Sequence, residues 1–303
     1  MNPSDTQPAV PVNATAPHAG TAASRQQRPP FIRPVRIGRD AGALAGIHQP
    51  VAEPRPETGV LICNPFGQEA IRAQRSLRVV SERLSRQGVP SLRFDYFGTG
   101  DSPGEDGSGH LPRWRQDILL ADVHLRQLSG CRTTIWMGLR LGATLALQAA
   151  ELIGDLPQPR RIILWEPVLD GKQYLEHLAR MNEFWTRQRN VTSETLGFAL
   201  TTRIRRHLEA IRPDGLPLPA GSALDLLGTK ALPGRGAFIG HCRKHDAPLD
   251  DILLESTVEW TSNTALDSQW VPDEAIAVLL EICTRPANTP AKESPPATPP
   301  QAQ

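Results

Sequence analysis

The sequence has only four cysteines in 303 residues. Cys63, Cys131, Cys242 and Cys283 are far apart, which argues against a disulfide framework and against a paired zinc-finger pattern. We expect all four to be free thiols. Histidines lie on both sides of Cys242, but a structural zinc site takes four ligands and no second cluster supplies the fourth. The sequence therefore predicts no metal site, and nothing in it indicates a cofactor.

The sequence also lacks an excess of either charge and any long apolar run. Its 33 basic and 32 acidic residues give a formal net charge of +1, which argues against an overall electrostatic footprint for nucleic acid. The basic cluster at residues 203–207 shares its predicted helix with apolar residues, so we interpret it as a solvated helix face. No apolar run approaches the length of a membrane span, and no secretory signal pattern is present. We therefore expect a cytoplasmic protein without a membrane span.

Proline, by contrast, is abundant, and many prolines lie near the two ends of the chain. Residues 1–30 and 285–303 are rich in small, polar and proline residues without hydrophobic periodicity. Such segments bury too little apolar surface to offset the entropy of ordering them, so we expect two disordered tails. Residues 31–284 are predicted to form one α/β domain.

Strands and helices are predicted to alternate within this domain. We expect a hairpin of strands at 31–37 and 44–48, further strands at 59–63, 91–94, 134–137 and 161–165, and helices at 69–87, 114–128 and 141–152. This alternation predicts a largely parallel sheet that binds ligands at the carboxyl ends of its strands. Residues 171–221 interrupt it with helical patterns at 173–187 and 193–211, which we expect to form a lid. Beyond them we expect strands at 237–240 and 257–260 and a helix at 273–283.

The pattern that bears most directly on function is the turn Gly138-Leu-Arg-Leu-Gly142, between a strand and an Ala/Leu-rich helix. Small residues on both sides of the turn let the helix pack closely on the strand it follows. In a nucleophile elbow, the sequence Gly-x-Ser-x-Gly uses this geometry to present a catalytic serine. Here the residue at the tip is Arg140, whose guanidinium stays protonated and only donates hydrogen bonds. Arg140 cannot act as an acyl-transfer nucleophile.

The order of these elements, the elbow, the loop at 63–67 and the stretch at 94–102 resemble the α/β-hydrolase superfamily, most nearly its serine-aminopeptidase-like branch. The loop at Asn64, the elbow turn and the segment 165–171 are similar to hydrolase-like proteins found in exosortase and exopolysaccharide gene settings. The resemblance covers about residues 31–283. It implies an α/β-hydrolase fold: a mostly parallel central sheet with helices on both faces and a helical lid insertion.

The resemblance also implies positions for a catalytic triad. The nucleophile falls on Arg140 and the acid on Asp246, with Asp250 and Asp251 as competitors. The histidine falls between residues 263 and 271, where the sequence has none. Two of the three roles are therefore vacant, and losing a triad serine or histidine costs a serine hydrolase about a millionfold in turnover.

Two other residues are candidates to replace the missing groups. Cys63 and His241 are each predicted at the end of a strand near the elbow, where a thiol and an imidazole would face the cleft. A buried strand cysteine is usually inert, however. Ser102 follows a glycine-rich loop, where a turn or capping role is favoured over catalysis.

Arg140 itself has two interpretations. It lies at a helix N-terminus, whose partial positive charge disfavours a cation, so a partner is needed. One interpretation is an ion pair with Glu166 or Asp95, each at the end of a predicted neighbouring strand. The other is a site where Arg140 and the backbone donors of the elbow hold a carboxylate, phosphate or sulfate. The candidate binding residues are Arg140, Leu141, Asn64, Phe66, Gly67 and Glu166.

Two hypotheses about function follow. In the first, the chain is a non-catalytic, hydrolase-like binding or accessory protein, linked by its resemblance to exopolysaccharide or exosortase systems. It holds a small anionic or acyl-bearing molecule, or a protein partner, in the cleft under the lid. In the second, it is an atypical hydrolase of an ester, thioester or amide bond. The absent histidine favours the first. A third interpretation places the function in the proline-rich tails, as an interaction scaffold.

Overall fold

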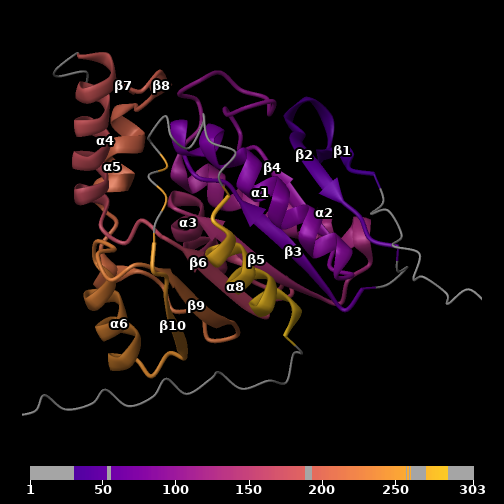
Figure 1. The fold of residues 1–303 in the computed structure, drawn as a ribbon. Helices are drawn as coiled ribbons and strands as arrows, with labels where there is room; N and C mark the ends of the chain where they lie inside the picture. The colour runs from indigo at the N-terminus through magenta and orange to yellow at the C-terminus, as the bar shows by residue number, and fades with distance from the viewer. Residues whose placement is uncertain are drawn as a thin grey trace, which may run out of the picture.

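The computed structural model describes residues 31–52, 56–187, 193–256, 258, 260 and 271–285. Its centre is an eight-stranded sheet in the order β1-β2-β4-β3-β5-β6-β9-β10 (Figure 1). The pairings β1–β2 and β2–β4 are antiparallel and the others are parallel, as the alternation of elements predicted. The strands are β1 (Arg33–Ile37), β2 (Leu44–Gln49), β3 (Thr58–Cys63), β4 (Ser91–Phe94), β5 (Thr133–Leu139), β6 (Arg161–Trp165), β9 (Ala223–Gly228) and β10 (Leu249–Leu253).

Helices cover both faces of this sheet. One apolar cluster packs α2, α3 and α6 on one face, and a second packs α1 and α8 on the other. The strands contribute side chains to the two clusters on opposite faces. Trp136 of β5 belongs to the first cluster and Trp165 of β6 to the second, and the two rings are almost fully buried. The helices are α1 (Gln68–Arg86), α2 (Leu111–Ser129), α3 (Leu141–Ala149), α4 (Gly171–Thr186), α5 (Thr202–Glu209), α6 (Arg235–Lys244) and α8 (Asp273–Thr284).

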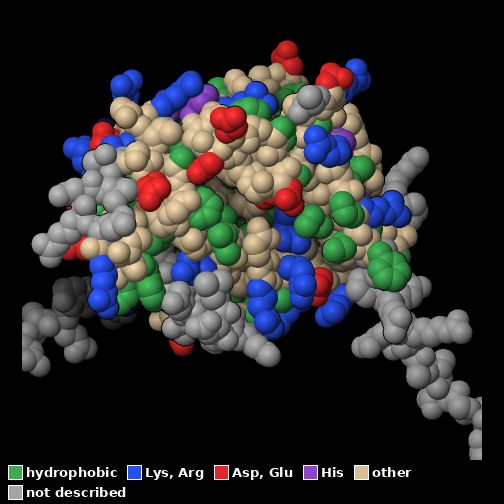
Figure 2. All heavy atoms as spheres, turned by 90° about the horizontal axis from the view of Figure 1, so that it is seen from above, with side chains coloured by type: hydrophobic (Ala, Val, Ile, Leu, Met, Phe, Trp, Pro, Cys, Tyr) green, Lys and Arg blue, Asp and Glu red, His purple; other side chains and the backbone are tan. Residues whose placement is uncertain are grey.

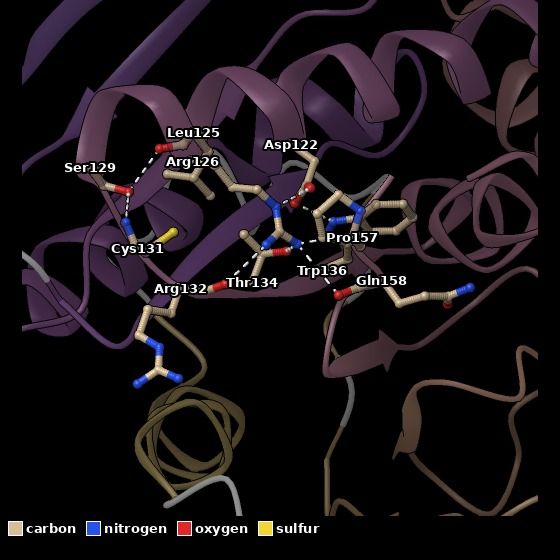
Figure 3. Close-up of polar contacts among 10 residues, drawn as sticks. All are labelled: Asp122, Leu125, Arg126, Ser129, Cys131, Arg132, Thr134, Trp136, Pro157 and Gln158. Atoms are coloured by element: carbon tan, nitrogen blue, oxygen red, sulfur yellow. Dashed lines mark hydrogen bonds and ion pairs between the residues drawn. The ribbon is translucent and has the colours of Figure 1, made fainter. Parts of the chain in front are cut away.

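A buried polar network fixes α2 to the sheet (Figure 3). The Asp122 carboxylate accepts a hydrogen bond of 2.7 Å from the Trp136 indole and one of 2.8 Å from Arg126 Nε. The Arg126 guanidinium also donates to the Thr134 hydroxyl at 2.6 Å, and to carbonyl oxygens of Pro157 and Gln158 just before β6. One ion pair thus connects α2, β5 and the loop that precedes β6.

An insertion lies between β6 and β9. It contains α4, the short hairpin β7 (Glu194–Thr195) and β8 (Phe198–Ala199), α5 and a 3-10 turn, η3 (Pro213–Gly215). Figure 1 shows α4, α5 and the hairpin grouped together at one end of the molecule. The predicted helix at 173–187 is present as α4, but the single helix at 193–211 is wrong. Gly197 has a φ of 82°, which turns the hairpin, and the Thr201 hydroxyl caps a later start of α5.

The order of elements after the insertion also differs from the prediction. Residues 237–240 belong to α6 and not to a strand, because the buried residues Phe238 and Cys242 are spaced by one helical turn. The last two strands are β9 and β10, which the sequence did not predict. Val258 and Trp260 are not in a strand, and the rest of that predicted strand lies outside the described residues. The predicted closing helix is present as α8. Of the two proposed tails, only Arg285 falls within the described residues.

Candidate functional site

The turn between β5 and α3 has the geometry of an elbow. Arg140, at its tip, has φ 54° and ψ −123°, a strained conformation for a residue other than glycine. A Cβ atom at Gly138 would clash with the backbone of Ala143, and one at Gly142 would clash with the carbonyl oxygens of Cys63 and Asn64 at the end of β3. The two glycines are therefore required by close backbone approach. Arg140 is presented at the carboxyl edge of the sheet.

The Arg140 side chain does not extend into solvent. Its Nε donates to Glu69 Oε1 at 2.9 Å, and the guanidinium lies 5.6 Å from the centre of the Tyr174 ring. The Tyr174 hydroxyl donates to the other Glu69 oxygen at 2.8 Å. The Glu69 side chain is 1% exposed and that of Arg140 16%. Three elements thus meet at the elbow tip: the first turn of α1, the elbow itself and α4 of the insertion.

The ion-pair partner of Arg140 differs from the prediction. A structural pair was expected with Glu166 or Asp95, but the carboxylate in contact is that of Glu69. Glu166 is nearby: its backbone oxygen accepts from Arg140 Nη1 at 3.3 Å, and its carboxylate accepts from the Trp260 indole at 2.9 Å. Glu69 lies in the first turn of the helix that follows β3, the strand beside β5. That topology is the sequence signal that could have identified it.

The electrostatics keep Arg140 charged. Burial alone lowers the pKa of its guanidinium, but the adjacent Glu69 carboxylate, supported by Glu166, outweighs burial and raises the pKa above its ordinary value. A buried guanidinium with a buried carboxylate partner is a closed pair. The Glu69 carboxylate thus balances the charge of the guanidinium.

A first cavity of about 500 Å³ lies on one side of the elbow. Four of the predicted binding residues line it, namely Asn64, Phe66, Gly67 and Leu141. Its other walls come from α1, α2, the loop after β4 and the hairpin of the insertion. Much of this lining is apolar or aromatic; it includes Tyr96, Trp114, Leu145, Phe198 and Ile204.

The charges around the first cavity are of one sign. Asp95, Asp101 and Asp106 line it, and among the described residues of its lining there is no lysine, arginine or histidine. Figure 2 shows a hollow bordered by hydrophobic and acidic side chains on this view of the molecule, with basic side chains interspersed over the wider face. Burial raises the pKa of the Asp95 carboxyl above its ordinary value. The cavity suits an apolar ligand without negative charge.

A second cavity, of about 310 Å³, lies on the other side of the elbow. Arg140 and Glu166, the remaining two predicted binding residues, line it together with Glu69 and Tyr174. Polar residues of α4 and the Trp260 ring complete it. The six predicted binding residues are therefore brought to one edge of the sheet but are divided between two cavities.

The comparisons with known proteins bear on the fold. No protein-family model and no curated protein sequence matches the chain. Among solved structures, Est1E from Butyrivibrio proteoclasticus, in a structure with bound ferulic acid, aligns at 16% identity over 82% of this chain and 97% of its own, with a TM-score of 0.58. An esterase of Pyrococcus furiosus aligns at 13% identity over 83% and 89%, with a TM-score of 0.58. Mouse alpha/beta hydrolase domain-containing protein 10 aligns at 16% identity over 82% and 98%, with a TM-score of 0.53.

The chain has the α/β-hydrolase fold. In this fold the nucleophile is presented at a strained turn between a strand and a helix, with the triad acid and histidine following later in the chain. Arg140 occupies the turn. The acid and the histidine of a triad would lie at the carboxyl ends of the strands that follow β5.

The acid assigned from the sequence does not lie at this edge. Asp246 was predicted to follow a strand, but it follows α6, which runs from the carboxyl end of β9 to the amino end of the parallel strand β10. Asp246 is therefore exposed at the edge of the sheet opposite Arg140. The two alternative residues for the triad acid are both in ion pairs. Asp250 lies 3.6 Å from Arg161, and Asp251 pairs with Arg235.

The residues directly after β9 include no carboxylate, and those directly after β10 include one, the exposed Glu255. Thr229 and Lys230 follow β9, so no carboxylate stands there. Leu254, Glu255 and Ser256 follow β10, and the segment predicted to lack a triad histidine, residues 263–271, lies outside the described residues except for its last one, Val271. The Arg140 guanidinium itself contacts the Glu69 carboxylate and the Glu166 backbone oxygen.

Neither Cys63 nor His241, the two substitute candidates, lines either cavity. Cys63 ends β3 as predicted, but its side chain is fully buried, and burial raises the pKa of the thiol far above its ordinary value. A thiol in that state is a poor nucleophile. His241 lies on α6, not at the end of a strand; its Nε2 lies 3.0 Å from the Leu216 carbonyl oxygen and its ring packs against His245. The Ser102 hydroxyl donates to the Asp95 carbonyl and accepts from Ala45 N, which is a structural role.

The described residues contain no group of three or more His, Cys, Asp or Glu side chains arranged to hold a metal ion. No helix in that part of the chain combines the length and apolarity needed to cross a membrane.

Proposed function

We propose that this chain is a non-catalytic protein with the α/β-hydrolase fold, which binds a small acyl-bearing molecule and does not turn it over. The observation that carries the proposal is the elbow tip. The position that presents a nucleophile in a hydrolase is occupied by Arg140, and its guanidinium is held in a buried pair with Glu69. A residue that only donates hydrogen bonds and is already paired cannot attack a carbonyl carbon.

The first cavity supports the ligand class. Its volume of about 500 Å³ lies in the range of small-molecule sites, and its lining combines aromatic and aliphatic walls with a few polar groups. The carboxylates of Asp95, Asp101 and Asp106 disfavour an anionic ligand there. We therefore assign the cavity to an uncharged acyl-bearing molecule in preference to an anionic metabolite.

The biological setting of this binding is part of the proposal. The loop at Asn64, the elbow turn and the segment 165–171 are similar to hydrolase-like proteins of exosortase and exopolysaccharide gene settings. That similarity supports an accessory role in such a system, with the bound acyl-bearing molecule as its cargo or signal.

Binding of octanamide, an uncharged medium-chain acyl molecule, tests the ligand class by titration calorimetry. We expect octanamide to bind and octanoate to bind at least about tenfold more weakly, because octanoate adds a negative charge beside three carboxylates. Phe198→Ala removes one aromatic wall and should weaken octanamide binding by about tenfold. The matched control is Phe184→Ala, because Phe184 is 68% exposed on α4 and lines neither cavity.

Three outcomes decide the proposal. Octanamide binding that Phe198→Ala weakens and Phe184→Ala leaves unchanged supports it. Preferred binding of octanoate would contradict the assignment of an uncharged ligand. Equal effects of the two phenylalanine variants would contradict the first cavity as the site.

A further inference from the structure

The two cavities meet at one wall, and consecutive residues of the chain face opposite sides of it. On α1, Glu69 lines the second cavity and Ala70 lines the first. On the elbow, Arg140 lines the second cavity and Leu141 lines the first. No described residue lines both. The wall therefore consists of the start of α1 and the elbow tip.

Buried side chains hold this wall together. Glu69 accepts from Arg140 Nε at 2.9 Å and from the Tyr174 hydroxyl at 2.8 Å, so both carboxylate oxygens are used. Tyr174 comes from α4 of the insertion and is 4% exposed. Burial and these two hydrogen bonds thus fix Glu69, Arg140 and Tyr174 on the side of the wall that faces the second cavity. A small residue at position 140 would leave the space of the Arg140 side chain unfilled.

We propose that Glu69, Arg140 and Tyr174 form a partition that limits the length of the ligand. The proposal rests on the assignment of the first cavity as the binding site. With the partition in place, an acyl chain fills the first cavity and is stopped at the elbow. Without it, the two cavities are continuous past the elbow, and a longer molecule enters both. Arg140 is thus a specificity-determining residue in the place of a nucleophile.

The test compares two double variants with the wild type, using straight-chain amides from butanamide to hexadecanamide as probes in titration calorimetry. Glu69→Ala with Arg140→Ala removes both charges and opens the wall. Glu69→Leu with Arg140→Met also removes both charges but keeps the wall filled. Both variants avoid leaving one buried charge unpaired.

We expect the wild type to bind amides up to a limiting chain length and longer ones no more tightly. The opened variant should extend this limit, with each further methylene tightening binding by about two- to fourfold. The filled variant should keep the wild-type limit. Melting curves of both variants confirm that they are folded.

Each result has a definite meaning. An unchanged limit in the opened variant, with short amides still bound, overturns the partition and leaves the proposed function standing. The same extension in both variants also overturns it, because the charges and not the filled space would then set the limit. Failure of the wild type to bind any amide contradicts the proposed function and the partition together.

Discussion

Arg140 has three energetically unfavourable features: a positive φ, a position at a helix N-terminus and a buried charge. Each is compensated locally. Close glycines on both sides permit the turn, Glu69 neutralises the guanidinium, and the carbonyl of Glu166 accepts a further hydrogen bond. The presence of arginine was evident in the sequence. Its partner was not, because Glu69 lies 71 residues away and only the packing of α1 beside β5 brings it near.

Because Arg140 and Glu69 form a buried ion pair, replacing Arg140 alone should cost more stability than replacing both residues. Arg140→Ala leaves the Glu69 carboxylate buried without its cation, which should lower the free energy of unfolding by about 3–5 kcal/mol. Glu69→Leu combined with Arg140→Met removes both charges at similar volume and should lose much less. Urea denaturation of the two variants measures the difference. A loss in the double variant as large as that in Arg140→Ala would contradict the unpaired carboxylate as the cause, because the double variant buries no charge at these two positions.

At the scale of elements, the sequence was informative for the apolar strands in the first part of the domain and misleading for β9 and β10, which contain aspartates. The hairpin β1–β2, strands β3 to β6 and helices α1 to α4 match their predicted positions closely. Strand β9 was missed because Asp225 interrupts its apolar run. Asp225 is fully buried and accepts from Arg161 Nη1 at 2.6 Å across to β6, an ion pair that only the folded sheet provides. Because β9 and β10 were not predicted, Asp246 was assigned to the end of a strand where the structure has α6.

The buried histidine His48 on β2 should make the stability of the protein depend on pH. Burial, with Arg33 on the paired strand and His124 on α2, lowers the pKa of His48 from 6.5 to about 4. The unfolded chain therefore binds the proton first, so His48 costs stability progressively as the pH falls from about 6.5 towards 4. Between pH 7 and pH 5 this amounts to about 2 kcal/mol.

His48→Gln should remove this part of the acid sensitivity. Urea denaturation at pH 7 and pH 5 is expected to show a smaller difference between the two pH values for the variant than for the wild type. An equal difference in the two proteins would mean that another group is responsible.

For the whole molecule, the sequence was sufficient to predict the fold class and the position of the elbow between β5 and α3. Both follow from local signals, the alternation of elements and the elbow glycines. It could not predict that the candidate binding residues divide between two cavities, because that division depends on how α4 and the hairpin of the insertion pack over the elbow. Asp246 lies at the opposite edge because α6 runs back from β9 to the amino end of the parallel strand β10, which no local pattern indicates.

The most direct test of the central claim follows the fate of a bound acyl molecule. Purified protein in molar excess is incubated with methyl octanoate, an octanoyl thioester and an octanoyl anilide, and the bound fraction is analysed by mass spectrometry. The account predicts that each molecule is recovered intact and that the protein mass is unchanged, for the wild type and for Cys63→Ala alike. Release of octanoate above the rate without protein, or an octanoyl adduct on the chain, would contradict a non-catalytic role.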